Sequence, residues 1–306
     1  MTAAWRGVHR LAVAFLATVV ALGSCTTSPV VSGGSQSPTV TVAAPSVPTR
    51  SGEYHPSGGA ALADEPDYYR DGCRFAADVD TPPPAGRCVY GDPHGLPVAI
   101  VGDSKIGQWM PALQRIAEVE HWRLLFYSRS SCPFATEADQ TNCSRFVERV
   151  FTQLRDEEKP KLIFSSHISR TDPVIRSESA LLTELHTALG TRAVLLADTP
   201  QRGTSSMFDC LRAATDYVAD CSFRKNDGSG TPALRAIAQQ VPDAVFVTMN
   251  DVVCPTTATC PPVLDHILLY RAGSHLTKTF INALAPTLHL RLIEAGVAKR
   301  PVITAS

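Results

Sequence analysis

The stretch Pro97-Val-Ala-Ile-Val-Gly-Asp-Ser104 decides the fold of this chain. The residues before Gly102 form a continuous apolar run, which is typical of a strand buried on both faces of a sheet. Residues 104–118 then carry apolar side chains at helical spacing. The stretch therefore predicts a strand that turns directly into a helix, with Ser104 at the turn.

The alternation of strand and helix continues along the chain, and a last helix over residues 275–295 is expected to break near Pro286. Further strands are expected at 123–127, 161–165, 193–197 and 244–249, and further helices at 143–154, 180–189 and 232–241. Such alternation predicts a mainly parallel sheet of about five strands, covered by helices on both faces. We expect one α/β domain over residues 65–306, with its site at the carboxyl ends of the strands.

Composition argues against two broad classes of protein. The chain has 306 residues, a formal net charge of -1 and 44% hydrophobic residues. Such an apolar fraction is not that of a wholly disordered chain. A nucleic-acid-binding protein needs an excess of Lys and Arg to neutralise phosphates, so the charge argues against a nucleic-acid partner.

Residues 1–24 are interpreted as a lipoprotein signal peptide. A basic start precedes the uncharged apolar run 11–22, which is too short for a permanent membrane span. The run ends in Leu22-Gly-Ser-Cys25, which resembles a bacterial lipobox, whose cysteine is acylated and becomes the new N-terminus. Cys25 is thus the predicted lipidation site, and the alternative is a plain signal peptide with an incidental cysteine.

Residues 25–64 are rich in Ser, Thr, Pro, Gly, Val and Ala. This composition buries too little surface to offset the entropy of the chain, and it predicts a flexible tether. We therefore expect the protein on the outer face of a bacterial plasma membrane, held there through a lipid anchor, or secreted.

The nine cysteines are an odd number, and Cys25 leaves eight in the folded body. An extracytoplasmic compartment permits disulfides, and many connectivities are open to eight cysteines. Spacing favours pairing between neighbours in the sequence. These couples are Cys73 with Cys88, Cys132 with Cys143, Cys210 with Cys221, and Cys254 with Cys260. The alternative is a metal site, but the chain has no CxxC motif and no histidine at zinc-finger spacing, so neither a metal nor a cofactor is expected.

Two polar residues lie where expected strands end. Ser104 begins a helix, where its own N–H can stabilise an oxyanion, although a serine that only caps the helix has the same place. His275 follows a short final strand within Tyr270-Arg-Ala-Gly-Ser-His-Leu-Thr277. Residues after the first and last strands can meet at one edge of the sheet. Ser104 and His275 are therefore candidates for a nucleophile and its general base.

At these residues the chain resembles the SGNH (GDSL) hydrolases. Gly102-Asp-Ser-Lys-Ile-Gly-Gln-Trp-Met-Pro-Ala-Leu113 is similar to their first block, in the form found in SGNH domains fused to or partnered with membrane O-acyltransferases. Ser130-Ser-Cys-Pro133 is similar to the second block of that branch, and Tyr270-Arg271 with His275-Leu-Thr277 to its last. The resemblance extends over about residues 70–290, and the four cysteine couples are also similar to those of that branch.

The resemblance implies a flavodoxin-like, three-layer α/β/α sandwich, the SGNH hydrolase fold. It implies hydrolysis or transfer of acyl esters through an acyl-Ser104 intermediate, with His275 as base and the backbone N–H groups of Ser104 and Ser131 in the oxyanion hole. It further implies an acylated glycan of the cell envelope, or a small acyl ester, as substrate, and a membrane acyltransferase as a partner.

The chain departs from the family pattern at the catalytic acid. The acid lies three residues before the histidine, where this chain has Ala272. Three hypotheses follow: a Ser–His dyad, a substitute for the acid, or an SGNH-fold binding or scaffold protein that has lost catalysis and accompanies a membrane acyltransferase. Asp265 and a backbone carbonyl are the candidate substitutes.

A second departure is the missing Gly-x-Asn-Asp block, which supplies an oxyanion-hole asparagine in the family. Its expected place holds Ser165-Ser-His167, so Ser166 and His167 are candidate donors, or merely loop residues. Lys105 stands where the branch usually has histidine, and it is interpreted as a solvated surface residue or as a contact for an anionic group of the substrate.

Overall fold

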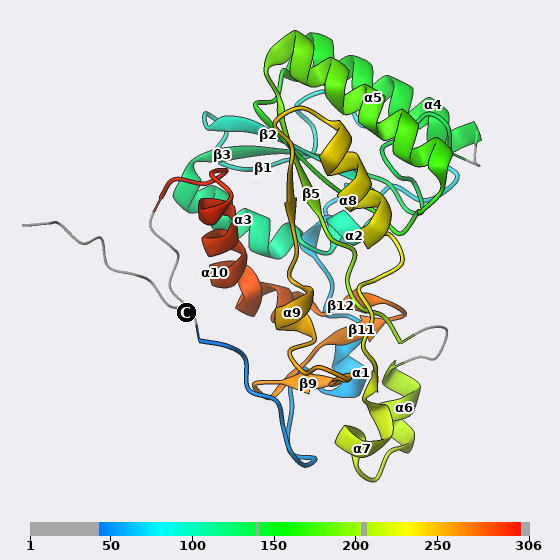
Figure 1. The fold of residues 1–306 in the computed structure, drawn as a ribbon, viewed down its shortest axis with the longest axis vertical. Helices are drawn as coiled ribbons and strands as arrows, with labels where there is room; N and C mark the ends of the chain where they lie inside the picture. The colour runs from blue at the N-terminus through cyan, green and yellow to red at the C-terminus, as the bar shows by residue number, and fades with distance from the viewer. Residues whose placement is uncertain (1–42, 139–140, 203–206, 301–306) are drawn as a thin grey trace, which may run out of the picture. The chain divides into compact units, whose positions relative to one another are not determined.

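A computed structural model describes residues 43–138, 141–202 and 207–300 (Figure 1). The chain divides into two units, Met1–Thr39 and Val40–Ser306, and all the described residues belong to the second. The expected signal peptide 1–24, the lipidation site Cys25 and the tether residues 26–42 lie outside the described residues. No helix within the described ranges is both long enough and apolar enough to cross a membrane.

A central sheet runs through the described part of the chain, with the strand order β1-β3-β2-β4-β5-β7. Its strands are β1 (Val89–Gly91), β2 (Leu96–Gly102), β3 (Trp122–Ser128), β4 (Leu162–Ser166), β5 (Arg192–Leu196) and β7 (Val245–Val247). The last five pair in parallel and are the expected strands, whereas β1 is an additional antiparallel edge strand beside β3. The parallel strands have the flavodoxin-like order, which confirms the expected fold class.

Helices cover both faces of this sheet (Figure 1). On one face lie α3 (Met110–Glu120) and α10 (Lys278–Glu294), and on the other α4 (Thr141–Gln153), α5 (Asp172–Leu189) and α8 (Thr231–Gln240). Along β2, Val98 and Ile100 join the first core, whereas Ala99 and Val101 join the second. Side chains alternate across a strand, so a continuous apolar run is what a doubly covered strand requires.

Three predicted helices differ in detail, and the one expected at 180–189, α5, begins earlier, at Asp172. The helix after Ser104 forms two pieces, α2 (Ser104–Gly107) and α3. The last helix, α10, begins at Lys278 and continues through Pro286, so the predicted break is wrong. Proline lacks the N–H that would bond the carbonyl four residues earlier. Here the side chain of Arg115 donates to that carbonyl, on Asn282, at 2.8 Å, and a neighbouring helix thus supplies the missing donor.

Smaller elements surround the ends of the strands. They are α1 (Gly58–Ala61), the 3-10 helix η1 (Asp67–Tyr69), the π-helical turn η2 (Leu154–Glu158), α6 (Met207–Ala213), α7 (Tyr217–Cys221), α9 (Asn250–Val253), and the short strands β6 (Phe223–Arg224), β8 (Thr259–Cys260), β9 (Val263–Leu264), β10 (Ile267–Leu268), β11 (Tyr270–Ala272) and β12 (His275–Leu276). Each of the four cysteine couples forms the disulfide that spacing favoured. These crosslinks close short loops and stabilise the fold mainly by restricting the unfolded chain.

The second half of the expected tether packs against the body instead of being free. The N–H of His55 donates to the carbonyl of His266 at 2.9 Å, and the N–H of Leu268 donates to the carbonyl of His55 at 2.8 Å. The ring of Tyr54 lies edge-on to that of Tyr217, with the centroids 5.3 Å apart. The tether prediction is therefore wrong for this part. Backbone hydrogen bonds and an aromatic contact offset the conformational entropy that the segment loses when it is ordered.

Candidate active site

Ser104 begins α2 at the point where the connections from the sheet diverge, between β2 and β4. The turn into α2 requires glycine at position 102. Gly102 has a φ of +115°, and a Cβ there would lie 2.4 Å from the carbonyl oxygen of Ser166 on β4. Only a residue without a side chain permits this close approach of the two strands.

The side chain of Asp103 forms hydrogen bonds with the backbone of α2 and with the segment after β4. Its Oδ1 accepts from the N–H of Lys105 at 2.8 Å, and its Oδ2 accepts from the N–H of Ile168, after β4, at 2.9 Å. The side chain is buried, and burial raises the pKa of this carboxyl above its ordinary value. Asp103 thus orders the backbone on both sides of Ser104, and it caps α2.

The structure brings Ser104 and His275 together across 171 positions of sequence. The Nε2 atom of His275 lies 2.8 Å from the Oγ of Ser104, and its Nδ1 lies 3.3 Å from the carbonyl oxygen of Ala272. A carbonyl oxygen can only accept, so Nδ1 carries the proton and Nε2 of the neutral ring is free to accept from the serine hydroxyl. This is the tautomer that a general base for Ser104 needs.

The surroundings of His275 keep its ring neutral. Burial lowers the pKa of His275 to about 4, and the positive charges of Lys105 and Arg271 act in the same direction. Arg74 adds a weaker contribution of the same sign. At neutral pH the imidazole is therefore in the form that accepts a proton.

Asp265 does not take the place of the missing acid, so this expectation is corrected. Asp265 and His266 have φ values of 47° and 60° and form the turn between β9 and β10. Two consecutive residues of positive φ make a tight hairpin turn. The carboxylate of Asp265 accepts from the N–H of Ser46 at 2.7 Å and also from its hydroxyl. The backbone carbonyl of Ala272, the other candidate, is the group that faces Nδ1 of His275.

Lys105 is buried, which corrects its interpretation as a solvated residue or a substrate contact. Its Nζ lies 2.9 Å from Oδ1 of Asp198, and it donates to the Thr199 hydroxyl at 3.1 Å and to the Ser274 carbonyl at 3.0 Å. Asp198 and Thr199 follow β5, and sequence reasoning missed them. The signal that could have found them is the one that found Ser104, namely polar residues directly after a buried strand.

Gln108 holds the other side of the histidine segment. Its Oε1 accepts from the N–H of Leu276 at 3.0 Å, and its Nε2 donates to the Thr199 hydroxyl at 3.2 Å. Together with the bond from Lys105 to Ser274, this contact anchors the residues on both sides of His275 to the turn that carries Ser104. The imidazole is thus positioned through its backbone neighbours as well as through Nδ1.

The candidate oxyanion-hole residues have three different environments. The Ser166 hydroxyl is buried and has no hydrogen-bond partner among the residues that the structure describes. His167 is fully buried, with Nε2 2.9 Å from Oε2 of Glu178 on α5, so its predicted role as a donor to substrate is corrected. Burial alone would lower the pKa of His167, but the Glu178 carboxylate raises it overall. Ser131 is exposed, with a φ of 55°.

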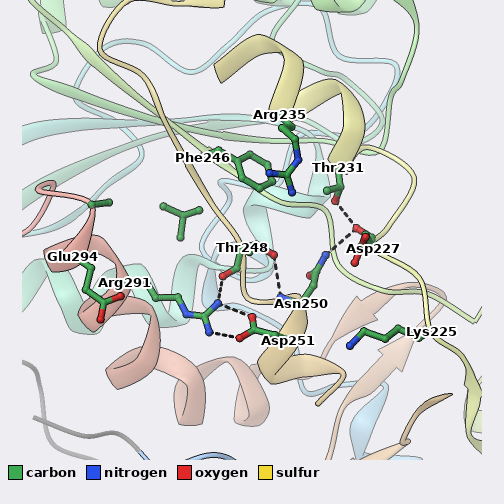
Figure 2. Close-up of a pocket in the computed structure, with 12 residues that line it drawn as sticks. Lys225, Asp227, Thr231, Arg235, Phe246, Thr248, Asn250, Asp251, Arg291 and Glu294 are labelled. Atoms are coloured by element: carbon green, nitrogen blue, oxygen red, sulfur yellow. Dashed lines mark hydrogen bonds and ion pairs between the residues drawn. The ribbon is translucent and has the colours of Figure 1, made fainter. Parts of the chain in front are cut away.

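A small recess surrounds Ser104, lined by side chains from the segment before β1 and from the end of β3. The lining residues besides Ser104 are Tyr68, Tyr69, Arg74, Phe75, Ser128 and Ser130. A larger hollow, drawn in Figure 2, lies beside β7 and α10, where Arg291 is ion-paired with Asp251 at 2.6 Å. Neither Ser104 nor His275 lines this second hollow, which is separate from the Ser–His pair.

A serine and a histidine in hydrogen-bond contact, at the switch point of a flavodoxin-like α/β sheet, have the arrangement of the nucleophile and base in serine hydrolases. The family model described as SGNH domain (fused to AT3 domains) matches residues 72–289, and the chain belongs to this family.

Two solved structures are similar to this chain at low identity. The periplasmic domain of a lipopolysaccharide acetyltransferase from Salmonella ser. Paratyphi A has 11% identity and a TM-score of 0.49, with 66% of this chain and 84% of that chain covered. The C-terminal catalytic domain of peptidoglycan O-acetyltransferase A from Streptococcus pneumoniae, with a methylsulfonyl adduct, has 12% identity and a TM-score of 0.34, with 69% and 99% covered. No curated protein is significantly similar to this chain.

Proposed function

We propose that the protein is an extracytoplasmic serine esterase or O-acyltransferase that acts on acylated carbohydrate of the cell envelope. The observation that carries the proposal is the 2.8 Å contact between Ser104 Oγ and His275 Nε2. Membership of a family of SGNH domains fused to AT3 acyltransferase domains supports acyl transfer as the chemistry. The likeness of the sequence blocks to SGNH domains partnered with membrane O-acyltransferases supports an envelope glycan as substrate.

The first half of the proposed reaction forms an acyl-enzyme. The Oγ of Ser104 attacks the carbonyl carbon of the ester while its proton passes to Nε2 of His275. The resulting oxyanion accepts hydrogen bonds from the backbone N–H groups of Ser104 and Ser131. The N–H of Ser104 lies in the first turn of α2 and so has no acceptor within the helix. The C–O bond then breaks, and the leaving alcohol takes the proton from Nε2.

The second half returns the enzyme to its starting state. A water molecule or a sugar hydroxyl gives its proton to Nε2 of His275 and attacks the acyl carbon. The bond to Oγ breaks, and Ser104 recovers the proton. Transfer to water is hydrolysis, and transfer to a sugar is O-acylation of the glycan.

The proposed catalyst works as a dyad. Neutralising the acid of a serine-protease triad lowers turnover by about 10⁴, because the histidine is then held in the wrong tautomer. Here Ala272 supplies a carbonyl to Nδ1, which fixes the tautomer but adds no negative charge to stabilise the imidazolium. We expect turnover to be slower than in an enzyme with the complete triad.

The cellular setting of the proposal is the outer face of the plasma membrane, with lipid anchoring at Cys25 and a membrane acyltransferase as the donor or partner. The four disulfides support an oxidising compartment.

A fluorophosphonate probe of serine nucleophiles tests the proposal. The purified protein is expected to be labelled, and the matched variant Ser104→Ala is not. A mass increase on the peptide that contains Ser104 locates the label. Absence of labelling at saturating probe would instead support the alternative function, an SGNH-fold binding or scaffold protein, which Ala272 favours.

A further inference from the structure

Three positive side chains, Lys105, Arg271 and Arg74, lower the pKa of His275. Carboxylates of the chain itself neutralise the first two. Lys105 is ion-paired with Asp198 at 2.9 Å. Arg271 lies 3.4 Å from Oε2 of Glu65, and it donates to the hydroxyl of Tyr69 at 2.6 Å. The charges of these two residues are therefore balanced within the fold.

Arg74, the third of these side chains, differs from the other two. It is exposed, and no carboxylate of the described residues pairs with it. Its guanidinium stacks over the ring of Tyr69, 4.6 Å from the centroid, and Arg271 lies 4.8 Å from the same centroid. A stacked guanidinium is pre-ordered, which lowers the entropy lost when it binds an anion.

Arg74 is also placed to reach a substrate. It lines the same recess as Ser104, together with Tyr69 and Phe75. A guanidinium binds carboxylates through paired N–H donors. The unpaired charge of Arg74 beside Ser104 raises the free energy needed to form an imidazolium on His275. An anion bound to Arg74 removes this unfavourable contribution.

We infer that Arg74 is a specificity-determining residue that binds a carboxylate of the acylated substrate. The carboxylate can lie on the acyl chain, as in a dicarboxylic half-ester, or on the sugar, as in a uronic acid. The inference rests on the proposed function and assigns to it an anionic class of substrate.

Binding is tested first, without any need for turnover. In ¹⁵N spectra of the full-length protein, the Nε–H resonance of Arg74 is identified by its loss in Arg74→Gln. Methyl glucuronoside is compared with methyl glucoside for the sugar, and monomethyl succinate with dimethyl succinate for the acyl chain. We expect one of the carboxylates to shift the Arg74 resonance, and its neutral counterpart to leave it unchanged. If neither carboxylate shifts Arg74 more than it shifts Arg87, the inference is wrong.

Arg87 is the matched control because it is exposed and adjoins the same disulfide, Cys73–Cys88, but does not line the recess.

Hydrolysis is then measured with two pairs of substrates. The first pair is two nitrophenyl esters, one with a carboxylate on the acyl group and one with a neutral acyl group. The second pair is an acetylated glucuronoside and an acetylated glucoside. The Ser104→Ala rate is subtracted throughout. We expect kcat/KM to favour the anionic member of one pair. This preference is expected to fall about tenfold in Arg74→Gln, as for loss of a charged hydrogen bond, to recover partly in Arg74→Lys and to persist in Arg87→Gln.

The outcomes separate the two proposals. An unchanged preference in Arg74→Gln overturns the assignment of Arg74 while Ser104-dependent hydrolysis still supports the esterase. A shifted Arg74 resonance in a protein that shows neither Ser104-dependent hydrolysis nor Ser104-dependent fluorophosphonate labelling supports the anion site and contradicts the proposed function.

Discussion

The Nδ1 atom of His275 lies 3.3 Å from the carbonyl oxygen of Ala272, the residue at which the family pattern has its acid. The two residues are register partners in the β11–β12 hairpin, so the backbone itself supplies the contact. A carbonyl fixes which ring nitrogen carries the proton, but it cannot balance the charge of an imidazolium. The site therefore has the geometry of a serine–histidine pair, but it lacks the negative charge that the acid of a catalytic triad would supply.

Restoring the acid is expected to increase activity. Ala272→Asp places a carboxylate at the position of the family's acid, and we expect the rate of labelling by the fluorophosphonate to rise at least about tenfold, below the upper bound of about 10⁴ set by a complete triad. The matched control is Ala272→Asn, which has a similar size and no charge. Equal rates for the Asp and Asn variants would show that position 272 does not act on His275 electrostatically.

The labelling rate is expected to depend on pH with a low midpoint. Burial and nearby cations lower the pKa of His275 to about 4 from an ordinary value of 6.5. The ring accepts the proton of Ser104 only when it is neutral, so the rate falls as the pH decreases through about 4 and stays level between 5 and 7. Rate constants measured over this range check the prediction, and a midpoint near 6.5 in the wild-type protein contradicts it.

Removing the buried charge of Lys105 is expected to destabilise the fold. Lys105→Met leaves Asp198 as an unpaired carboxylate in a position that is 0% exposed. Breaking one half of a buried ion pair costs roughly 3–5 kcal/mol of unfolding free energy. Denaturant unfolding measures this loss.

The double variant Lys105→Met, Asp198→Asn is the control for Lys105, because it removes both charges. It is expected to recover a large part of the lost free energy. Equal stability of the single and double variants would mean that the effect of Lys105→Met comes from packing and not from the unpaired Asp198.

Gly102, in the turn that leads into Ser104, is expected to be irreplaceable. In Gly102→Ala the new Cβ would lie 2.4 Å from the Ser166 carbonyl oxygen, so β2 and β4 must separate and Ser104 must move. We expect loss of labelling and a loss of stability greater than about 2 kcal/mol, since steric overlap adds to the cost of a positive φ.

Gly190 offers a matched control for Gly102. It has a φ of +68° with no atom within 4 Å of the new Cβ, so Gly190→Ala tests the backbone conformation alone. This variant is expected to lose about 1 kcal/mol and to keep its labelling. Retained labelling in Gly102→Ala would contradict the role given to the turn.

The sequence was sufficient for features that depend on residues close together in the chain. The apolar run of β2 predicted a doubly covered strand, and the helical spacing after it placed Ser104 at a strand-to-helix turn. The short separations of the cysteines, 6 to 15 positions, predicted their pairing. These signals are local because strand periodicity, helix periodicity and short loop closure are properties of neighbouring residues.

The tertiary structure alone decided the environment of each site residue. Asp265 was a plausible acid until the β9–β10 turn directed its carboxylate to Ser46. Lys105 was interpreted as a surface residue, yet it is buried because Asp198, 93 positions later in the segment after β5, neutralises it. Pro286 was expected to break α10, but Arg115 supplies the missing donor. In each case a partner distant in sequence changes the cost of burying a charge or a backbone group, and only the three-dimensional fold specifies that partner.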